Sequence, residues 1–486
     1  MISFMSLLPL GMRKNTARGS SDRPPSHDDE LHIAGTALTP ESTITPEASQ
    51  NGSIVGNNAD DRDLTPISGS QTSARDMVIL GSGNALEWFG WVVFVSTAPF
   101  FSEQIFAHSS PLSAILATFA VFAVGFVARP LGAALLAHLA DRRGRVIALA
   151  LSIACVAAGS IGVALLPTYQ SIGDLSGVLL LCLRLLQGLG EGGELPTAQT
   201  YVAEIAPRGR RGLWSSMIYL SGQIGVICGL ALPASLSWFL GAEAMSEWGW
   251  RVPFAVGGIA GLAALAQRMT LQEPPSSASV VRSRDAHRTP WGLYRQRALQ
   301  ICGLVAGPAI VAYSWGAAAP AYATTILGVN PTAALWAAVG AYLLSVASLP
   351  AWATLSDRYG RKPNLLIGAL GCAAAVAPME LLLRSSAWQL FVAMSVILVL
   401  QSATLAIAPA LFAELFPTHI RVRGMALPYA ITVALFGGTA PYVETWLTAH
   451  HHPHLFTAAT IVALLVSAGT ALTLPETVGT DLEAVT

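Results

Sequence analysis

The chain has 486 residues, of which 53% are hydrophobic and only 11% are charged, and its formal net charge at pH 7 is −1. An average soluble domain carries roughly 25% charged residues, so this composition excludes an ordinary soluble protein and makes lipid the solvent for most of the chain. The near-zero net charge also argues against a nucleic-acid partner.

The first predicted element is a tail without a fold. Residues 1–76 are rich in Ser, Thr, Pro, Asp and Asn and lack a sustained hydrophobic period, so they do not bury enough surface to fold. We predict a disordered cytoplasmic tail. A mis-assigned start codon, with Met77 nearer the true beginning, is the alternative interpretation.

Apolar stretches of about twenty residues follow, and each is long enough to cross a hydrocarbon core of ~30 Å. They do not interleave polar faces at helical period, as the helices of a soluble enzyme would. We therefore predict an all-α membrane protein with twelve transmembrane helices. The stretches lie at 80–103, 112–136, 146–166, 177–202, 213–237, 252–269, 298–324, 333–354, 364–383, 388–413, 425–447 and 455–474.

A polar segment at 271–297 divides these stretches into two halves. It predicts an N-terminal six-helix half at 77–270 and a C-terminal six-helix half at 298–475, followed by a short cytoplasmic tail at 476–486. Arg and Lys gather in alternate connections, and the opposite connections are nearly bare of them. Because cytoplasmic loops keep the positive charges, both termini are predicted to be cytoplasmic.

The sequence offers little for a metal or cofactor. The five cysteines lie inside apolar stretches without paired spacing, which predicts neither a disulfide framework nor a metal cage. The run 188–193 satisfies the dinucleotide pattern GxGxxG, but no strand precedes it, and its glycines are better explained by close helix packing. No metal or nucleophile constellation is present in the sequence, so we expect no cofactor, no metal site and no enzymatic activity.

Two short motifs occur twice. The sequence DRRGR at 141–145 is repeated as DRYGR at 357–361, and AEIAP at 203–207 is echoed by AELFP at 413–417. Each Asp-Arg turn places opposed charges and a sharp glycine bend between apolar stretches, which suits a tight charged hinge at a membrane surface. The repetition indicates a duplicated transporter with its site at the midplane between the halves.

Over residues 80–475 these repeats resemble the hallmark loops of the major facilitator superfamily. Narrower matches resemble its metabolite:proton symporter branch, whose members carry α-ketoglutarate, citrate, shikimate, proline or betaine; they lie at 83–89, 129–132, 184–188, 192–194, 247–254 and 436–441. The resemblance implies a monomer in the lipid bilayer of a bacterial-type plasma membrane. It implies alternating-access transport of a small organic acid or zwitterion, coupled to protons.

The chain departs from this branch at three places. Gly90 stands where the branch usually has Asp, a candidate proton carrier. Leu195 and Pro196 replace the usual Tyr-Gly after Glu194, and Glu191 replaces a small or apolar residue. Substrate and coupling can therefore differ from those of the named members.

Arg129 is the first candidate for substrate contact. It lies twelve residues before Asp141, so it sits about 18 Å deeper in its helix, near the midplane. A guanidinium there needs a facing carboxylate or an anionic substrate held by bidentate hydrogen bonds. Structural pairing inside the bundle is the alternative for the arginine. Two tyrosines are added because the resemblance implies them, and an ordinary core role is the alternative for these. The candidate substrate-binding residues are Arg129, Arg184, Gln187, Tyr313 and Tyr429.

The fourth span carries a polar stripe. At 100° per residue, Arg184, Gln187, Glu191 and Glu194 share one side of the helix, which we expect to face the central cavity. With Gly90 in the usual carrier's place, the carboxylates left to couple protons in the first half are Glu87, Glu191 and Glu194. The alternative is that they only neutralise the buried arginines.

Charged residues also fall at predicted cytoplasmic helix ends. The resemblance implies that they form salt-bridge latches, which hold the cytoplasmic side closed and break when the site turns inward. Surface charge without a gating role is the alternative. These gating candidates are Asp141, Arg145, Glu204, Asp357, Arg361 and Glu414.

Two other functions remain open at this stage. An exporter of a small acidic product would show much the same sequence. A membrane receptor on the same scaffold would bind a ligand without flux, although duplicated latches favour a protein that moves.

Overall fold

The computed structural model of the chain describes residues 74–106, 110–143, 145–192, 199–200, 202–203, 206–269, 291–416 and 421–480. The predicted N-terminal tail and most of the predicted central loop lie outside these residues, as does the end of the chain. The described residues contain helices and no β-strand.

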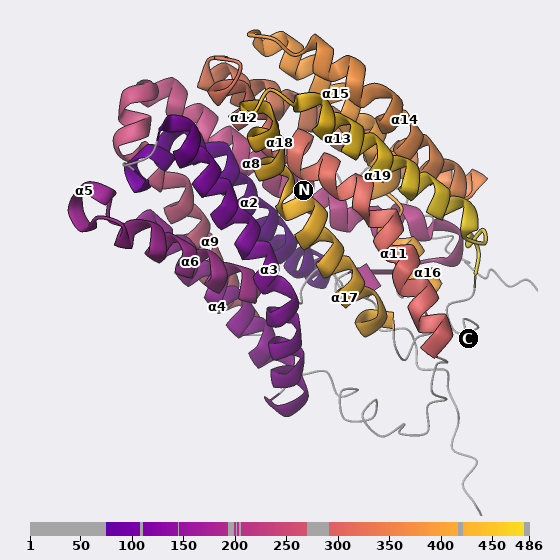
Figure 1. Cartoon of the computed structure of the whole chain (residues 1–486). Coiled ribbons are helices and arrows are strands. Elements are labelled where there is room, and N and C mark those ends of the chain that lie inside the picture. The colour runs from indigo at the N-terminus through magenta and orange to yellow at the C-terminus, as the bar shows by residue number, and fades with distance from the viewer. Residues whose placement is uncertain are drawn as a thin grey trace, which may run out of the picture. The chain divides into compact units, whose positions relative to one another are not determined.

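Figure 1 shows the helices of residues 74–269, here called the first half. They are α2 (Ala74–Ile105), α3 (Pro111–Arg143), α4 (Arg145–Ala164), α5 (Tyr169–Ile172), α6 (Leu175–Glu191), α8 (Arg211–Ala244) and α9 (Arg251–Arg268). A 3₁₀ turn, η1 (Arg208–Arg210), precedes α8, and a π-helical turn, η2 (Met245–Gly249), follows it.

The helices of residues 291–473, here called the second half, follow the same plan with more interruptions. They are α11 (Trp291–Val311), η3 (Ala312–Ala318), α12 (Ala319–Thr325), α13 (Pro331–Tyr359), α14 (Arg361–Leu382), α15 (Ala387–Leu405), α16 (Ala408–Leu415), α17 (Arg421–Thr432), η4 (Val433–Gly438), α18 (Ala440–Ala449) and α19 (Pro453–Thr473).

The predicted spans overlap these elements. The span predicted at 177–202 is described as the helix α6 to Glu191, and most of its remainder lies outside the described residues. Within the described residues, ten helical segments are long and apolar enough to cross a membrane by length and composition. The 17-residue α6 and α9, which carries Arg251 and Arg268 at its ends, complete the predicted set of twelve. The all-α prediction is confirmed. The helix α2 begins at Ala74, and its apolar span, Gly81–Ile105, begins close to the predicted residue 80.

Three predicted spans of the second half are not continuous α-helices. The span predicted at 298–324 contains the π-helical turn η3, and that at 425–447 contains η4. The span at 388–413 breaks between Leu405 and Ala408, and Pro409 lies in the first turn of α16. Apolar composition predicts that a segment is buried but not how its backbone hydrogen bonds are arranged, so these breaks were not predictable from hydropathy.

Local sequence sets the ends of α13. The side chain of Asn330 accepts a hydrogen bond from the Ala333 N–H at 3.1 Å, and Pro331 occupies the first helical turn. The helix ends at Gly360, whose φ of 110° suits glycine and few other residues. This glycine makes the sharp bend that the second Asp-Arg motif predicts.

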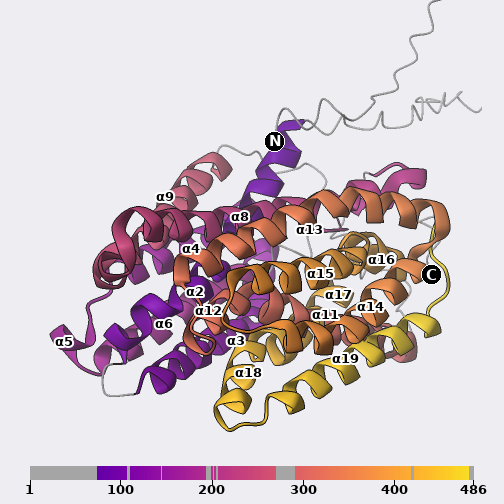
Figure 2. The same cartoon turned by 90° about the horizontal axis from the view of Figure 1, so that it is seen from above.

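The two halves meet mainly along α8 and α13, which lie side by side in Figures 1 and 2. Further contacts join α2 to α12 and α3 to η4 and α18. Within the first half, α2 packs on α8, α4 on α9, and α3 on α6.

Glycines bring α3 and α6 into close contact. A Cβ at Gly188 would collide with the carbonyl oxygen of Gly125, and one at Gly192 with the carbonyl oxygen of Arg129. Small residues allow helix backbones to approach in this way in membranes. The packing explanation of the GxGxxG run is therefore confirmed, and the same contact places Arg129 beside the end of α6.

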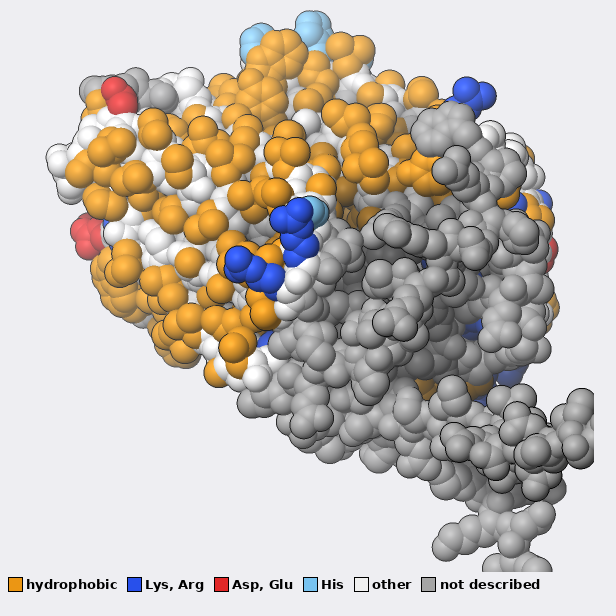
Figure 3. All heavy atoms as spheres, turned by 90° about the horizontal axis from the view of Figure 1, so that it is seen from below, with side chains coloured by type: hydrophobic (Ala, Val, Ile, Leu, Met, Phe, Trp, Pro, Cys, Tyr) orange, Lys and Arg blue, Asp and Glu red, His pale blue; other side chains and the backbone are white. Residues whose placement is uncertain are grey.

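Apolar side chains cover much of the surface. Figure 3 shows one side of the molecule, where hydrophobic side chains dominate the described part and Lys and Arg side chains are few. On α3, the side chains of Val127, Leu131 and Leu135 are exposed. Such an extended apolar exterior is what a membrane-embedded bundle requires.

We predict that Gly188→Val destabilises the protein by about 1–3 kcal/mol or more, because the new side chain pushes α6 away from α3. Thermal unfolding of the purified protein in detergent measures the effect. Gly469→Val is the matched control, since a Cβ at this exposed helical glycine meets no heavy atom within 4 Å. Equal melting temperatures for the two variants would contradict the prediction.

Candidate functional site

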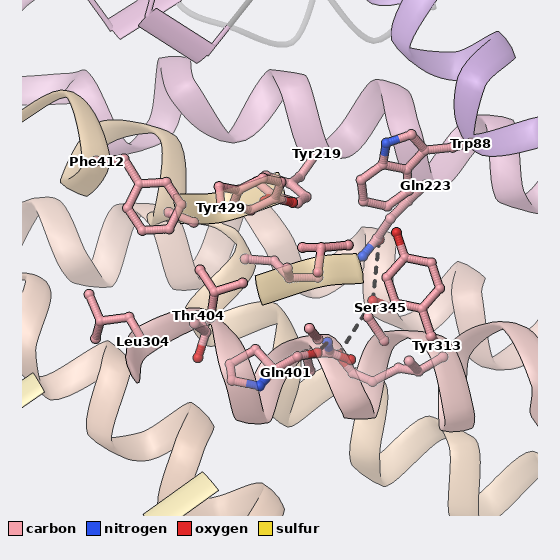
Figure 4. Close-up of a pocket in the computed structure, with 18 of the residues that line it drawn as sticks. Trp88, Tyr219, Gln223, Leu304, Tyr313, Ser345, Gln401, Thr404, Phe412 and Tyr429 are labelled. Atoms are coloured by element: carbon pink, nitrogen blue, oxygen red, sulfur yellow. Dashed lines mark hydrogen bonds between the residues drawn. The ribbon is translucent and has the colours of Figure 1, made fainter. Parts of the chain in front are cut away.

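A cavity lies between the two halves, near the middle of the helices (Figure 4). The first half contributes Trp88 and Trp91 from α2 and Tyr219 and Gln223 from α8. The second half contributes residues from α11, α13, α14, α15, α16 and α17 and from η3 and η4, and none of the described lining residues is charged. The polar ones among them are Tyr313, Tyr342, Ser345, Gln401, Thr404 and Tyr429.

Aromatic rings form one side of this cavity. The ring centroids of Trp91 and Tyr313 are 5.1 Å apart, and those of Trp88 and Tyr219 are 5.5 Å apart in an edge-to-face arrangement. The ring centroids of the two tryptophans are 5.7 Å apart. Rings of this kind offer both flat apolar faces and, through the tyrosine hydroxyls, hydrogen-bond partners for a small solute.

Amide and hydroxyl groups form the other side. Ser345 donates to Gln223 Oε1 at 3.2 Å and lies 2.7 Å from the hydroxyl of Ser402. Gln401 donates to the carbonyl oxygen of Pro308 at 2.9 Å, while its Oε1 and the Thr404 hydroxyl have no hydrogen-bond partner among the described residues. A buried polar atom left in this state is costly, so the wall is suited to a ligand that supplies the missing bonds.

A charged cluster lies beside the cavity, inside the first half. The Arg129 guanidinium pairs with the Glu191 carboxylate through Nη2, and its Nη1 lies 3.5 Å from Glu87 Oε1. The same guanidinium stacks on the ring of Phe126 at 4.0 Å. All three charged side chains are buried, with 6–9% of each residue exposed. One buried cation is thus shared by two buried anions.

Arg184 forms a second buried group on α6. Its Nη1 donates to Gln187 Oε1 at 2.7 Å, and Gln187 donates to the Ser160 hydroxyl at 3.0 Å. The Arg184 guanidinium also stacks over Phe94 at 4.2 Å. Together with Arg129, it balances the formal charges of the two carboxylates when both are ionised.

The sequence-predicted site is therefore split. Tyr313 and Tyr429 line the cavity between the halves, whereas Arg129, Arg184 and Gln187 do not. The stripe on α6 was expected to face the central cavity, and in this structure Glu191 instead lines a separate cavity within the first half. The reason is the close α3–α6 contact, which turns this side of α6 toward α3 and α4. Glu194 lies outside the described residues.

Ion pairs and helix caps connect the halves at one end of the bundle, where Arg211, Arg361 and Arg421 begin α8, α14 and α17; we call it the arginine end. The Asp357 carboxylate accepts hydrogen bonds from the backbone N–H groups of Gly212 (2.9 Å) and Leu213 (3.0 Å). A carboxylate at the first turn of a helix is favoured by the partial positive charge there. An anion of the second half thus caps a helix of the first.

Glu414 extends this contact, because it pairs with Arg211 of α8 at 3.1 Å and with Arg361 at 3.3 Å. Arg361 also pairs with Asp357 at 2.8 Å. The predicted gating residues Asp357, Arg361 and Glu414 thus form one network. Their counterparts lie outside the described part of the chain: the side chains of Asp141 and Arg145, and the whole of Glu204.

The segment after α19 joins the same network, which sequence reasoning did not predict. Glu476 accepts hydrogen bonds from the backbone N–H groups of Arg361 (2.7 Å) and Lys362 (3.2 Å), and Thr477 donates to Glu414 at 2.6 Å. Partial burial would raise the pKa of Glu476, but four backbone N–H donors outweigh it and lower the pKa below its ordinary 4.5.

The sequence also did not single out Gln223 and Ser345 as residues that line the cavity between the halves. A glutamine alone in an apolar span was the feature that could have identified Gln223.

Comparison with known proteins identifies the family. The family model for the Major Facilitator Superfamily matches residues 80–312, and the model for sugar and other transporters matches residues 285–486. The α-ketoglutarate permease of Escherichia coli is 32% identical over 411 residues, which cover 82% of this chain and 95% of the permease. The chain belongs to the major facilitator superfamily. It is a membrane transporter, and not an enzyme.

Other members of the superfamily show the same range of similarity. The citrate–proton symporter of Klebsiella pneumoniae is 32% identical over 75% of this chain and 83% of its own length. The glycine betaine/proline/ectoine/pipecolic acid transporter OusA of Dickeya dadantii is 30% identical over 75% of each chain. The solved structure of the inward-open xylose transporter XylE from E. coli matches 84% of this chain with a TM-score of 0.65 and 17% identity, which shows the shared fold.

The Arg129–Glu191 pair yields a testable prediction. Arg129→Gln leaves two carboxylates buried without their cation, which is expected to cost about 3–5 kcal/mol of stability. Arg129→Gln/Glu191→Gln removes one of the two stranded charges and is expected to be more stable than the single variant. Thermal unfolding in detergent gives the comparison, and additive losses in the double variant would show that the pair is not coupled.

Glu476 provides a pH-dependent prediction. A lowered pKa means that its stabilisation is complete above pH 4.5 and is lost as the pH falls through the lowered value. Glu476→Gln should therefore reduce the melting temperature at neutral pH, and the difference from wild type should shrink as the pH falls below 4.5. Glu243→Gln, at an exposed carboxylate on α8, is the control. A pH-independent difference would contradict this account.

Proposed function

We propose that the protein is a proton-coupled symporter that takes up a small organic acid or zwitterionic metabolite across the plasma membrane. The observation that carries the proposal is the pairing of one buried guanidinium with two buried carboxylates beside a neutral, polar cavity. In low dielectric such a cluster is sensitive to the gain or loss of a single proton.

Coupling follows from the charge balance. When Glu87 and Glu191 are both ionised, they neutralise Arg129 and Arg184. A proton moving from water to either carboxylate leaves the group with one net positive charge and weakens one ion pair of Arg129. That charge attracts the carboxylate of a solute in the adjoining cavity, to which Arg129 is linked through Phe126 and Tyr313, whose ring centroids are 4.9 Å apart. Solute and proton thus favour each other's binding.

Residue roles follow from this arrangement. Tyr313, Tyr429, Gln223 and Gln401 contact the solute, and Arg129 attracts its negative end while Arg184 and Gln187 hold α6 in place. Glu191 and Glu87 carry the proton, with Glu194 as a further candidate on the same span. A zwitterion gains additionally from the aromatic wall, because a quaternary ammonium group is stabilised by the faces of Trp and Tyr rings.

The latch at the arginine end supports alternating access. The network of Asp357, Arg361 and Glu414 closes one end of the passage by joining the halves. By the duplication of the motifs, the proposal assigns the corresponding role in the first half to Asp141, Arg145 and Glu204. The arginines at this end favour a cytoplasmic location for it, with both chain termini on that side. The transporter works as a monomer in lipid, with its two six-helix halves rocking about the central site.

Counterflow in reconstituted vesicles tests this function. Labelled α-ketoglutarate, citrate, proline and glycine betaine are offered with and without a pH gradient. We expect counterflow of at least one solute, and accumulation when the outside is acidic. Binding without flux would favour a receptor, and absence of binding and flux for all four would refute the proposed substrate class.

The coupling residue is tested in the same vesicles. Glu191→Gln is expected to keep counterflow but to lower pH-driven accumulation by about tenfold, a typical coupling between linked sites. Glu103→Gln, at an exposed carboxylate of α2, is the control and should behave as wild type. Undiminished pH-driven uptake by Glu191→Gln would place the coupling elsewhere.

A further inference from the structure

A second cavity lies wholly inside the first half, among α2, α4, α6 and α9. Its wall carries both carboxylates of the charged cluster, two hydroxyl groups of α4 and several glycines. The residues that matter here are Glu87, Gly90, Ser152, Ser160, Glu191 and Gly257. No described residue lines both this cavity, here called the inner cavity, and the cavity between the halves.

The two cavities lie on different faces of α2. Residues 87 and 90 are three apart and share the face toward the inner cavity, while Trp88 and Trp91 share the face toward the cavity between the halves. Arg129 connects the two spaces. Its guanidinium pairs with both carboxylates of the inner cavity and stacks on Phe126, which contacts Tyr313 in the other cavity.

The wall of the inner cavity is polar enough to hold water. The Ser152 hydroxyl donates to the carbonyl oxygen of Gly190 at 2.6 Å, and the Ser160 hydroxyl accepts a hydrogen bond from Gln187. Both oxygens keep further hydrogen-bonding capacity, and two carboxylates face the same space. Buried water settles where several polar partners of this kind converge.

One position of the wall has unoccupied space beside it. A Cβ added at Gly90 would meet no heavy atom within 4 Å. A Cβ at Gly257 would approach the ring of Phe89 to 2.9 Å, and one at Gly261 would approach Ala157 to 2.9 Å. Residue 90 is therefore the place at which the inner cavity accepts a new side chain without displacing its neighbours.

We propose that the inner cavity is a separate proton compartment. Protons reach Glu191 and Glu87 through water in this space without entering the solute cavity, and they leave by the same space when it opens to the other side. Coupling requires a carboxylate that faces the compartment and Arg129, whichever helix carries it. The proposal rests on the proposed proton-coupled transport for the use of these protons, while the hydration of the compartment stands independently of it.

Cysteine labelling tests the compartment without any solute. Gly90→Cys is placed in a chain whose five native cysteines are replaced by serine, and its reaction with 2-aminoethyl methanethiosulfonate is followed by mass spectrometry. Val92→Cys is the control on the same helix, because Val92 is fully buried and lines neither cavity. We expect residue 90 to react at least about tenfold faster, since the thiol reacts as a solvated thiolate.

Separation of the two spaces is tested by blocking one of them. In the double variant Gly90→Cys/Gln223→Cys, the cysteine in the solute cavity is first modified with a bulky benzyl methanethiosulfonate under conditions that leave residue 90 free. The reaction at residue 90 should keep its rate. An inert Gly90→Cys, or a reaction that stops after the block, would overturn the proposal.

Relocation of the carboxylate tests the function of the compartment. Glu191→Ala should keep counterflow and lose pH-driven uptake of the solute found by the four-solute screen. The pH-driven uptake by Gly90→Asp/Glu191→Ala should be about tenfold higher than that by Glu191→Ala. The matched control Gly90→Asn/Glu191→Ala should show no such increase. If counterflow is intact but Gly90→Asp does not restore uptake, the claim that the carboxylate can be moved between helices is refuted. If the wild type shows no counterflow, transport of these four solutes is refuted, and the labelling experiment alone then tests the compartment.

Discussion

The structure depends on the electrostatic balance around Arg129. A guanidinium at this depth is tolerated only because Glu191 and Glu87 contact it directly and the Phe126 ring covers one of its faces. The same balance couples the two carboxylates to each other, since both are stabilised by the shared cation. A buried cluster whose net charge changes with one proton is therefore a structural element, and it is where our proposal places coupling.

Small residues make this balance possible. The α3 and α6 backbones approach closely because glycines face each other, and that approach brings Arg129 within reach of Glu191. On the other side of the cluster, α2 presents its tryptophans to the neutral cavity and Glu87 to the charged one. One helix thus separates the neutral cavity from the cavity that carries the carboxylates. Arg129 lines neither cavity, but it contacts both carboxylates and stacks on Phe126, which contacts Tyr313.

Hydrophobic length and the duplicated motifs were sufficient to predict the twelve helices and their pairing into halves, because lipid forces each spanning segment to be apolar and helical. The residues of the charged cluster were also recognisable, since a charge in an apolar run needs an explanation. Their orientation was not, because helical periodicity gives the angle between residues but not which neighbour each face meets. The π-helical turns at Tyr313 and Val433 and the capping role of Glu476 likewise depend on tertiary contacts that leave no local pattern.

The cap that Asp357 places on α8 has a genetic consequence. Its partners are main-chain N–H groups, so almost no substitution within α8 deletes them, although proline would, and any side chain at Gly212 would crowd the carboxylate. A mutation that removes this cap is therefore expected almost entirely at one codon, that of Asp357. Side-chain substitutions along the remainder of α8 therefore leave both donors of this cap in place.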